Sequence, residues 1–458
     1  MKTKTKRDLC NGPILSNMFF YALPIIATGV LQTLYNAADT MVVGQFAGDE
    51  SLAAVSSTSH LINLLVNLFL GLSSGVLAVV ARHIGAKNKE MLRRSVHTAI
   101  PVALVCGLLL LVLGLLVSAP LLKLMGTGEP GTSVFPKAVL YTKIYFLGMP
   151  GFLLYNFGAS ILRAAGDTKR PLIFLTASGL LNVALNVLFV VSFQMDVAGV
   201  ALATIISQYI SAILVLFCLM REKSDIRFCI SHIVIDRSCL SEFFRIGLPA
   251  GVSASLFSVS NVLIQSTCNS FGDLYMAGKG AATQILNILY AVPAGYETTV
   301  LAYTSQNYGA QNKLRIRRGL YRAHLLTALS CATMSSLIML LHQPLLRLFT
   351  DNPVAIDAGK TYMFIILPSI LFGGAMNVQS SYIRGLGFSL VNTFISLFGT
   401  CALRVLWVYT VFPLLGSTWV ALYLTYPVTW AATFLGYLLY TRYANRVLRN
   451  LSDIKEVT

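Results

Sequence analysis

Charged side chains are scarce in this chain of 458 residues. Asp, Glu, Lys and Arg together make up 11% of it, whereas a soluble domain usually has about 25%. The hydrophobic share is 56% and the mean hydropathy is +0.71. Because so few charges do not suffice for a water-exposed surface, the composition argues against a soluble globular protein. Most of the chain is expected to lie in a lipid bilayer.

Motifs for nucleotide hydrolysis and metal catalysis are also absent. The sequence has no G-x-x-x-x-G-K-S/T loop for a nucleotide phosphate and no H-E-x-x-H zinc motif. Its six histidines have no ligand spacing, and its eight cysteines include no C-x-x-C pair. We therefore expect no enzyme, no resident cofactor, no structural metal and no disulfide framework.

Long apolar runs are what the chain has in abundance. A run of about 20 apolar residues crosses a bilayer as a helix. About twelve such runs are expected, six in each half: 14–40, 52–80, 98–120, 138–160, 171–193, 197–220, 243–268, 276–304, 320–342, 361–383, 388–411 and 415–440. The predicted fold class is an all-α polytopic membrane protein.

One nineteen-residue segment occurs twice. VLAVVARHIGAKNKEMLRR at 76–94 returns as VLAYTSQNYGAQNKLRIRR at 300–318, with nine identical positions. A repeat of this length indicates a duplicated half-protein rather than a solenoid. An even number of spans separates the two copies, so both copies lie on the same side of the membrane. We therefore expect two parallel six-helix lobes around a central cavity, a common plan among transporters.

Basic residues set the expected orientation of the chain. The net charge is +16, and 27 of the 34 Lys and Arg residues fall in the tails and loops on one side of the expected spans. Under the positive-inside rule that side is cytoplasmic. The layout is then a cytoplasmic tail at 1–13, an N-lobe at 14–220, a cytoplasmic linker at 221–242, a C-lobe at 243–440 and a cytoplasmic tail at 441–458. Contact with anionic lipid explains the basic loops, so no nucleic-acid partner is expected.

Two acidic side chains, Asp39 and Glu297, lie well within expected spans. Such a group costs several kcal/mol in the bilayer unless it faces a wet cavity or a partner. Gln32, Tyr35, Asn36 and Asp39 recur at i, i+3, i+4 and i+7, so they share one helix face, which is expected to point into the bundle. The alternative is a carboxylate held only by helix–helix hydrogen bonds. The functional interpretation is favoured, because intramembrane acids mark ion and substrate pathways.

Side-chain oxygens on other spans suit a site around Asp39. Asn182 and Asn186 lie one turn apart on the fifth expected span, and Thr204 lies on the sixth. Each suits hydrogen bonding or Na⁺ coordination, although singly each is better explained by an interhelical hydrogen bond. A carboxylate that exchanges a proton or Na⁺ is what an antiporter requires. We expect ion coupling at Asp39, with Na⁺ there as the alternative to a proton.

The second half has different charged positions. Aligning the seventh span with the first places Asn261 opposite Asn36, and the acid at Asp39 has no counterpart. Ion coupling is therefore expected chiefly in the first lobe. Two interpretations of Glu297 stay open: it binds a substrate cation, or it pairs with Arg404 on the eleventh span.

A proline and several aromatic residues complete the candidate set. Pro24 can bend the first span, so it is a candidate hinge that converts protonation of Asp39 into helix movement; a static kink is the alternative. Tyr35 and Tyr290 are expected to line the substrate cavity, although most aromatic residues in spans serve packing. The remaining expected cavity residues are Gln32, Glu297 and Arg404.

These residues resemble those of the multidrug and toxic compound extrusion (MATE) family. The segment LPIIATGVLQTLYNAADTMVVGQFAGDESLAAV at 23–55 is similar to the family's opening, including its acid and its proline. GAKNKEMLRR and SQNYGAQNKLRIRR resemble its loops after the second and eighth spans. RAAGDTKRP at 163–171 and RGLGFS at 384–389 resemble the loops after the fourth and tenth spans. The resemblance covers roughly residues 12–442.

The resemblance implies export of amphipathic, often cationic compounds, driven by inward H⁺ or Na⁺ through two rocking lobes. Carried over, Asp39 is the coupling acid, surrounded by Asn182, Asn186 and Thr204. Position 186 is an acid in some relatives, and a seventh-span glutamate used in another branch is absent here. Proton coupling at Asp39 is therefore preferred. The protein is also expected to be a monomer and to lie in the plasma membrane.

The main rival function is a flippase for lipids or lipid-linked sugars in the same superfamily. Such a protein is expected to line its cavity with several Arg or Lys residues, to hold a pyrophosphate group. Arg404 is the one basic residue expected deep in a span, against two acids, so the cavity is predicted to favour cations. A gated channel requires a longer polar lining than this chain offers.

Overall fold

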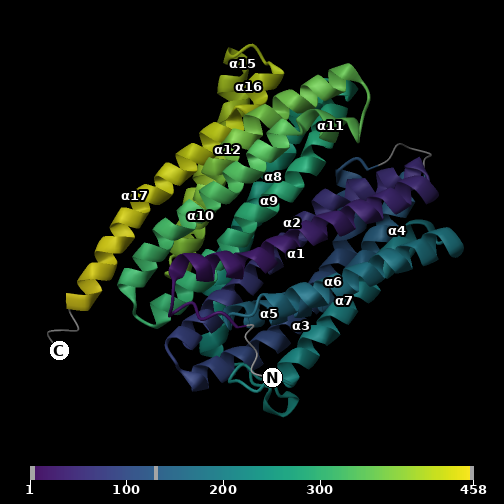
Figure 1. Cartoon of the computed structure of the whole chain (residues 1–458). Helices are drawn as coiled ribbons and strands as arrows, with labels where there is room; N and C mark the ends of the chain where they lie inside the picture. Colours follow the sequence, from purple (N-terminus) through teal and green to yellow (C-terminus); the bar gives the residue numbers. More distant parts are fainter. Residues whose placement is uncertain (1–5, 128–132, 454–458) are drawn as a thin grey trace. The chain divides into compact units, whose positions relative to one another are not determined.

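The computed structural model describes residues 6–127 and 133–453, and in these ranges the regular structure is entirely helical. The expected cytoplasmic tails at 1–13 and 441–458 therefore lie partly outside the described residues. Figure 1 shows long helices joined by short loops. The long helices of the first half are α1 (Ile14–Phe46), α2 (Asp49–Gly85), α3 (Lys89–Leu124), α4 (Val134–Leu147), α5 (Met149–Ala164), α6 (Lys169–Asn186) and α7 (Asp196–Met220).

The second half repeats this pattern of long helices. They are α8 (Arg237–Asn269), α9 (Asp273–Gly309), α10 (Lys313–Leu340), α12 (Pro353–Gly385) and α17 (Thr425–Asp453). Shorter elements are α11 (His342–Arg347), α13 (Ser389–Ser396), α14 (Leu403–Leu406), α15 (Phe412–Leu414) and α16 (Trp419–Tyr423). The π-helical segments are η1 (Val187–Ser192), η3 (Leu397–Ala402) and η4 (Trp407–Val411), and η2 (Ile230–His232) is a single 3₁₀ turn.

Each expected span corresponds to a helix or a run of helices in this order. Within the described residues, nine helical segments are long and apolar enough to cross a membrane, or ten if the bent pair α4 and α5 forms one span. The two others, α9 and α16–α17, are helical but are not among them. In α9 the polar residues Lys279 and Glu297 reduce the hydropathy. The predicted all-α polytopic fold is confirmed.

The duplicated segment also repeats in backbone geometry. Lys87 and Gln311, at equivalent positions after α2 and α9, both have positive φ, of 54° and 56°. The next residue in each copy, Asn88 or Asn312, accepts a hydrogen bond at its side chain from the backbone N–H three residues later, at 3.1 Å. An asparagine cap of this kind starts a helix. The identical asparagines therefore begin α3 and α10 in the same way.

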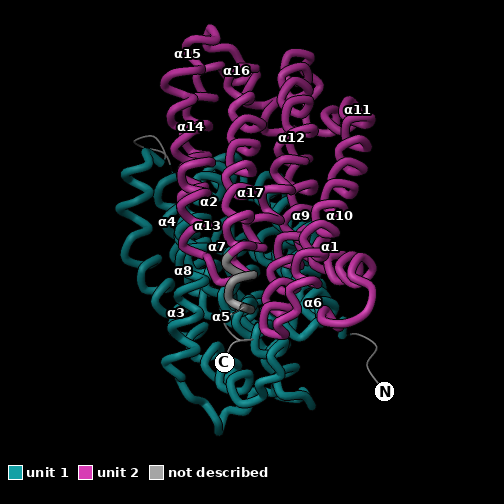
Figure 2. Tube along the Cα trace, turned by 90° about the vertical axis from the view of Figure 1, so that its left-hand side faces the viewer, with its two compact units in different colours: residues 1–7, 30–255 teal, residues 8–29, 256–458 magenta. Residues whose placement is uncertain are grey.

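The chain forms two compact units, coloured separately in Figure 2. Unit 1 comprises Met1–Arg7 and Val30–Ser255, and unit 2 comprises Asp8–Gly29 and Leu256–Thr458. The division runs within helices α1 and α8 rather than through the connector after α7. The lobe limits expected from the sequence, 14–220 and 243–440, differ from these unit limits and remain a prediction.

Small residues hold helices close together in unit 1. Helix α5 packs against α2, α3 and α7, and α6 packs against α7. Gly71 and Gly75 on α2 lie against Gly247 and Gly251 on the first part of α8, where a side-chain Cβ on any of them would overlap the facing backbone. Glycines four residues apart allow such close approach of membrane helices.

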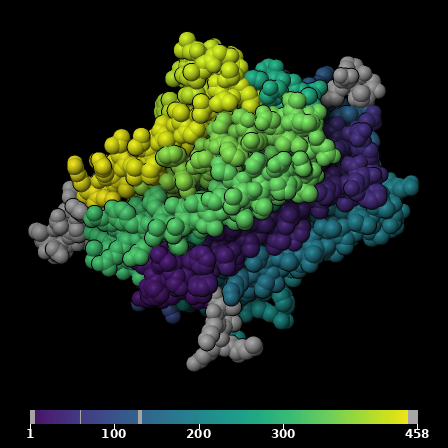
Figure 3. Space-filling view, turned by 45° about the horizontal axis from the view of Figure 1, so that its top comes forward, coloured from purple at the N-terminus to yellow at the C-terminus, as the bar shows by residue number. Residues whose placement is uncertain are grey.

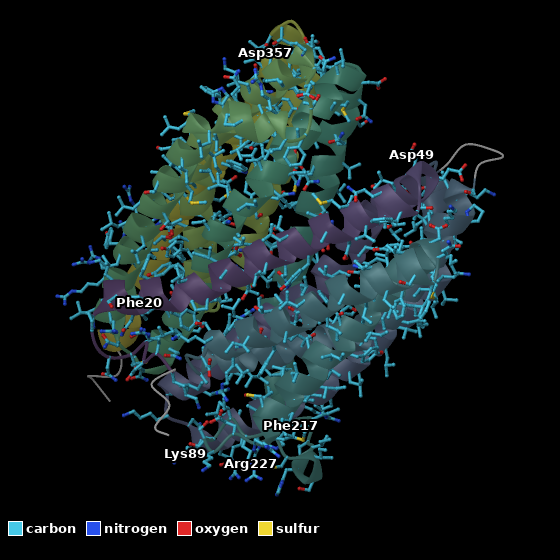
Figure 4. The ribbon with its side chains drawn as sticks, turned by 45° about the vertical axis from the view of Figure 1, so that its right-hand side comes forward. Phe20, Asp49, Lys89, Phe217, Arg227 and Asp357 are labelled. Atoms are coloured by element: carbon cyan, nitrogen blue, oxygen red, sulfur yellow. The ribbon has the colours of Figure 1, made fainter. Side chains whose placement is uncertain are left out.

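Figure 4 labels Lys89 and Arg227 at one end of unit 1 and Asp49 at the other.

The connector after α7 is tied to unit 1 by ion pairs. Glu222 accepts hydrogen bonds from Lys6 Nζ at 2.9 Å and from Arg170 Nη2 at 2.7 Å. Burial alone would raise the pKa of Glu222, but these two cations outweigh it and lower the pKa to about 2. The carboxylate therefore stays ionised and keeps the start of the connector in place at neutral pH.

In unit 2, α12 packs against α9, α10 and α17. Figure 3 shows the green and yellow helices of this unit as a continuous surface. The N-terminal segment before α1 is bound to the start of α10. Arg315 donates to the backbone oxygens of Leu9 at 3.1 Å, Asn11 at 2.8 Å and Gly12 at 2.9 Å. Leu9 itself is fully buried.

Candidate functional site

Unit 1 contains a partly open cavity of about 470 Å³. It is bounded by the second half of α1 together with α2, α4, α5, α6 and α7. Six residues expected from the sequence lie in its wall: Gln32, Tyr35, Asn36, Asp39, Asn182 and Thr204. The face of α1 at i, i+3, i+4 and i+7 therefore lines this cavity, as the spacing predicted.

The Asp39 carboxylate is held by asparagine side chains of α6. Asn186 Nδ2 donates to Asp39 Oδ1. With its amide oriented so that both polar atoms are satisfied, Asn182 Nδ2 donates to the same oxygen at 2.9 Å, and its Oδ1 accepts from the Thr204 backbone N–H at 3.3 Å. The four candidate residues of α1, α6 and α7 are thus in one hydrogen-bonded cluster, which we call the Asp39 cluster.

Burial differs sharply across the Asp39 cluster. Asn186 is fully buried, Asn182 is 6% exposed, and Asp39 is half-buried at the cavity wall. Asn186 Oδ1 has no hydrogen-bond partner among the described residues. A buried acceptor beside a carboxylate suits a cation, either a proton carried by Asp39 or a metal ion such as Na⁺. The cluster therefore offers oxygen atoms of the kind that bind a small cation.

Local helix geometry places the two asparagines. Asn182 and Asn186 are one turn apart, so they share a face of α6. The π-helical segment η1 begins directly after Asn186. Its wider turn changes the direction of the side chains that follow, and such segments are frequent at functional sites. Sequence periodicity alone did not indicate this change.

The position of the Tyr35 ring explains why residue 179 of α6 is a glycine. Its ring lies against Gly179, where an added Cβ would overlap the ring atoms. Its hydroxyl donates to the Thr176 backbone oxygen at 3.3 Å. The small residue therefore leaves room for the Tyr35 ring between α1 and α6, in the wall of the same cavity as Asp39.

Several cavity residues were not singled out from the sequence. Ser59, Asn63 and Asn67 on α2 recur every four residues, and Gln208 and Ser211 extend the face of Thr204 on α7. These polar stripes were a signal available in the sequence. Tyr141 and Tyr145 on α4 also line the cavity and stack at 6.0 Å between ring centroids. The sequence around these two tyrosines does not distinguish them from aromatic residues that only pack between helices.

Glu297 does not pair with Arg404, so that interpretation is wrong for this structure. Its Oε1 accepts from Arg384 Nη2, and Arg384 also donates to Ser381 Oγ at 2.9 Å. The sequence placed Arg384 in a loop, but it lies in the last turn of α12, which packs along α9. Helix packing thus supplies a partner for Glu297 that hydropathy did not indicate. A role of Glu297 in binding a substrate cation stays a prediction.

Arg404 lies in unit 2, and no acid in the described part of the chain forms an ion pair with it. Its Nη1 donates to Asn261 Oδ1 at 2.7 Å, and its guanidinium carbon lies 4.7 Å from the Phe257 ring centroid and 4.6 Å from that of Tyr426. Tyr290 is an electrostatic neighbour of the same guanidinium. These two expected cavity residues are therefore close together, but they belong to unit 2 and do not line the cavity around Asp39.

Pro24 lies inside the continuous helix α1, within the part that belongs to unit 2. Thr28 Oγ1 donates to the Pro24 backbone oxygen at 2.8 Å. A proline in this place removes one helical hydrogen bond and so weakens the helix locally. The predicted hinge role stays open. Among the described residues, no group of three or more His, Cys, Asp or Glu side chains is close enough to hold a metal ion.

The MatE family model matches residues 24–188 and again residues 249–410. The double match follows the internal repeat. The chain is 28% identical over 440 residues to the probable multidrug resistance protein YoeA of Bacillus subtilis, covering 93% of each chain. It is 27% identical over 398 residues to the probable multidrug resistance protein YpnP of the same organism, covering 87% of this chain and 88% of that one.

A solved structure has the same fold. It is an outward-facing conformation of a multidrug resistance MATE family transporter of the MOP superfamily, with a TM-score of 0.90 and 21% identity. The match covers 98% of this chain and all of that one. Because the family model matches both halves over most of their length, the chain belongs to the MatE family, the multidrug and toxic compound extrusion transporters.

Proposed function

We propose that this multidrug efflux transporter is a secondary antiporter that exports amphipathic organic cations in exchange for inward protons. The observation that carries the proposal is the Asp39 cluster in the wall of the unit 1 cavity. A half-buried acid with two amide donors and access to a cavity binds and releases a cation in response to its surroundings. The multidrug resistance names of the Bacillus relatives support drug export.

Protonation of Asp39 changes its hydrogen bonds, which links ion binding to movement. As a carboxylate, Asp39 accepts charge-assisted bonds from the asparagine amides of α6. A proton removes the charge that strengthens those bonds. The second half of α1 is then held less firmly against α6, and Pro24 offers a place where α1 can bend. Alternating access of the two lobes follows in this proposal.

Sodium is the second candidate coupling ion, favoured by one specific observation. Asn186 Oδ1 is a buried oxygen without a partner among the described residues, beside the Asp39 carboxylate. Together with the Asp39 carboxylate and the Thr204 hydroxyl it offers oxygen ligands of the kind that Na⁺ takes. Proton coupling and Na⁺ coupling therefore use the same residues.

The membrane placement completes the proposal. Both termini are cytoplasmic, since the basic loops gather on their side of the spans. The protein works as a monomer in the plasma membrane, with small molecules and lipid as its partners. The cavity wall combines aliphatic side chains and tyrosine rings with many hydroxyl and amide groups, which suits amphipathic substrates. A flippase for lipid-linked sugars is not favoured, because both Bacillus relatives are named as probable multidrug resistance proteins.

Uptake of a fluorescent organic cation into proteoliposomes tests the proposal. A pH gradient and a Na⁺ gradient are imposed separately, with wild type beside Asp39→Asn. Asp357→Asn, which changes an exposed acid of unit 2, is the matched control. We expect uptake driven by the pH gradient, lost in Asp39→Asn and kept in the control.

Uptake driven by the Na⁺ gradient and lost in Asp39→Asn would support Asp39 as the coupling site but identify Na⁺ instead of H⁺ as the coupling ion. Uptake that survives in Asp39→Asn would refute the coupling role of this residue. If no gradient drives uptake of any organic cation by wild type, cation export is refuted.

A further inference from the structure

Arg404 is a charged side chain buried without a counter-ion. It lies on α14, between the π-helical segments η3 and η4, and its side chain is fully buried. No carboxylate of the described part of the chain forms an ion pair with it. A buried charge without an ionic partner is strongly unfavourable. The transport role proposed above makes no use of Arg404.

The contacts of Arg404 leave one edge of its guanidinium group unused. Nη1 is engaged by Asn261 Oδ1, while Nε and Nη2 have no hydrogen-bond partner in the part of the chain that the structure describes. Nε and Nη2 form the side of the planar group that carboxylates and phosphates bind with two parallel hydrogen bonds. The free donors therefore match an anion with two oxygens.

Aromatic side chains hold the guanidinium and surround it with apolar surface. Phe257 and Tyr426 lie within cation–π distance, at 4.7 Å and 4.6 Å. Its other electrostatic neighbours are the hydroxyls of Tyr290 and Tyr362 and the thiol of Cys401, none of which is an acid. A flat ring next to a carboxylate or phosphate is the ligand shape that such surroundings favour.

The internal repeat places this site on the helices that correspond to those of the Asp39 cluster. The spacing from Arg163 to Asn182 equals that from Arg384 to Leu403, so Arg404 follows the equivalent of Asn182. Asn261 aligns with Asn36 on α1. Each unit thus has a polar site on the same pair of helices, but the charge is negative in unit 1 and positive in unit 2.

We propose that Arg404 and Asn261 bind the anionic group, a carboxylate or phosphate, of an aromatic substrate. The inference rests on the proposed transport function and extends its substrate class to zwitterionic and anionic aromatic compounds. The proposal requires a movement that gives the substrate access to the buried side chain. A change of η3 or η4 to regular α-helical bonding would rotate residue 404 about the helix axis, which is a movement of this kind.

A carboxyl-rhodamine and its methyl ester test the proposal, because they differ only in the anionic group. Uptake of each into proteoliposomes is measured for wild type, Arg404→Gln and Arg404→Lys. We expect wild type to take up the acid with a lower KM than the ester. We expect Arg404→Gln to raise the KM of the acid at least tenfold and to leave the ester within a factor of two.

Arg404→Lys keeps the charge but loses the two-donor edge, so we expect an intermediate KM for the acid. Equal effects of Arg404→Gln on acid and ester, or no effect on either, would overturn the proposal. Uptake of the ester alone by wild type would overturn it as well.

Equilibrium binding separates this proposal from the antiport proposal. The three tryptophans, Trp407, Trp419 and Trp430, all lie in unit 2, so their fluorescence reports binding there. We expect benzoate to quench it in wild type and in Asp39→Asn, but not in Arg404→Gln. Sodium phosphate and anionic lipid vesicles serve as competing sources of the anion. Quenching by these and not by benzoate would overturn the assignment to an aromatic substrate, whatever the result for Asp39→Asn transport.

Discussion

The ion pair between Glu297 and Arg384 leads to a quantitative stability prediction. The Arg384 side chain is 9% exposed and that of Glu297 is 32% exposed. Arg384 Nε already lacks a partner among the described residues, so removing the acid leaves a nearly buried cation with one hydrogen bond to Ser381. Breaking a buried ion pair from one side costs about 3 to 5 kcal/mol. Because water reaches Glu297, we expect Glu297→Gln to lose about 2 to 3 kcal/mol.

The double variant Glu297→Gln/Arg384→Gln removes both charges. It no longer leaves a cation buried alone, so we expect it to recover more than half of the loss. Thermal unfolding in detergent, followed with a thiol-reactive dye, measures the effect. The dye reports unfolding because Cys268 and Cys331 are buried in the same unit. We expect Glu297→Gln to lower Tm by about 5 °C or more.

Glu90→Gln is the matched control, since Glu90 pairs with Arg94 on an exposed face of α3. We expect no measurable change in Tm for this variant. If Glu297→Gln has the Tm of wild type, or if the double variant is as unstable as the single one, the pair is not the stabilising contact inferred here. Equal losses in Glu90→Gln and Glu297→Gln would refute the role assigned to burial.

Three further variants test other contacts. Gly179→Ala introduces a methyl group into the Tyr35 ring, so we expect transport of an organic cation to fall at least fivefold, while Gly280→Ala, which meets open space, has no effect. Glu222 has a lowered pKa of about 2, so its stabilising contribution is present at neutral pH and is lost as the pH falls from about 4.5 through 2. In Glu222→Gln the free energy of unfolding is expected to fall less over this pH range than in wild type. Asn312→Ala removes a helix cap, so we expect the free energy of unfolding, measured by thermal unfolding, to fall by about 1 kcal/mol.

The sequence predicted the helices and the repeat because both depend on local patterns. Apolar runs locate spans by length and hydropathy alone. The paired asparagines Asn88 and Asn312 start α3 and α10 through contacts within three residues. The face that contains Asp39 also follows from one helix, since a spacing of three and four residues defines a face without any knowledge of neighbouring helices.

Only the tertiary structure decided which residues meet across helices. The packing of α9 along α12 gives Glu297 its partner Arg384 in place of Arg404. The π-helical turns around Asn186 and Arg404 direct their side chains in ways that a regular period does not predict. Composition and spacing therefore determine that this chain spans a membrane as two related halves with an acid on the inner face of the first. Helix rotation and approach, which depend on the packing of all side chains at once, decide what each buried charge contacts.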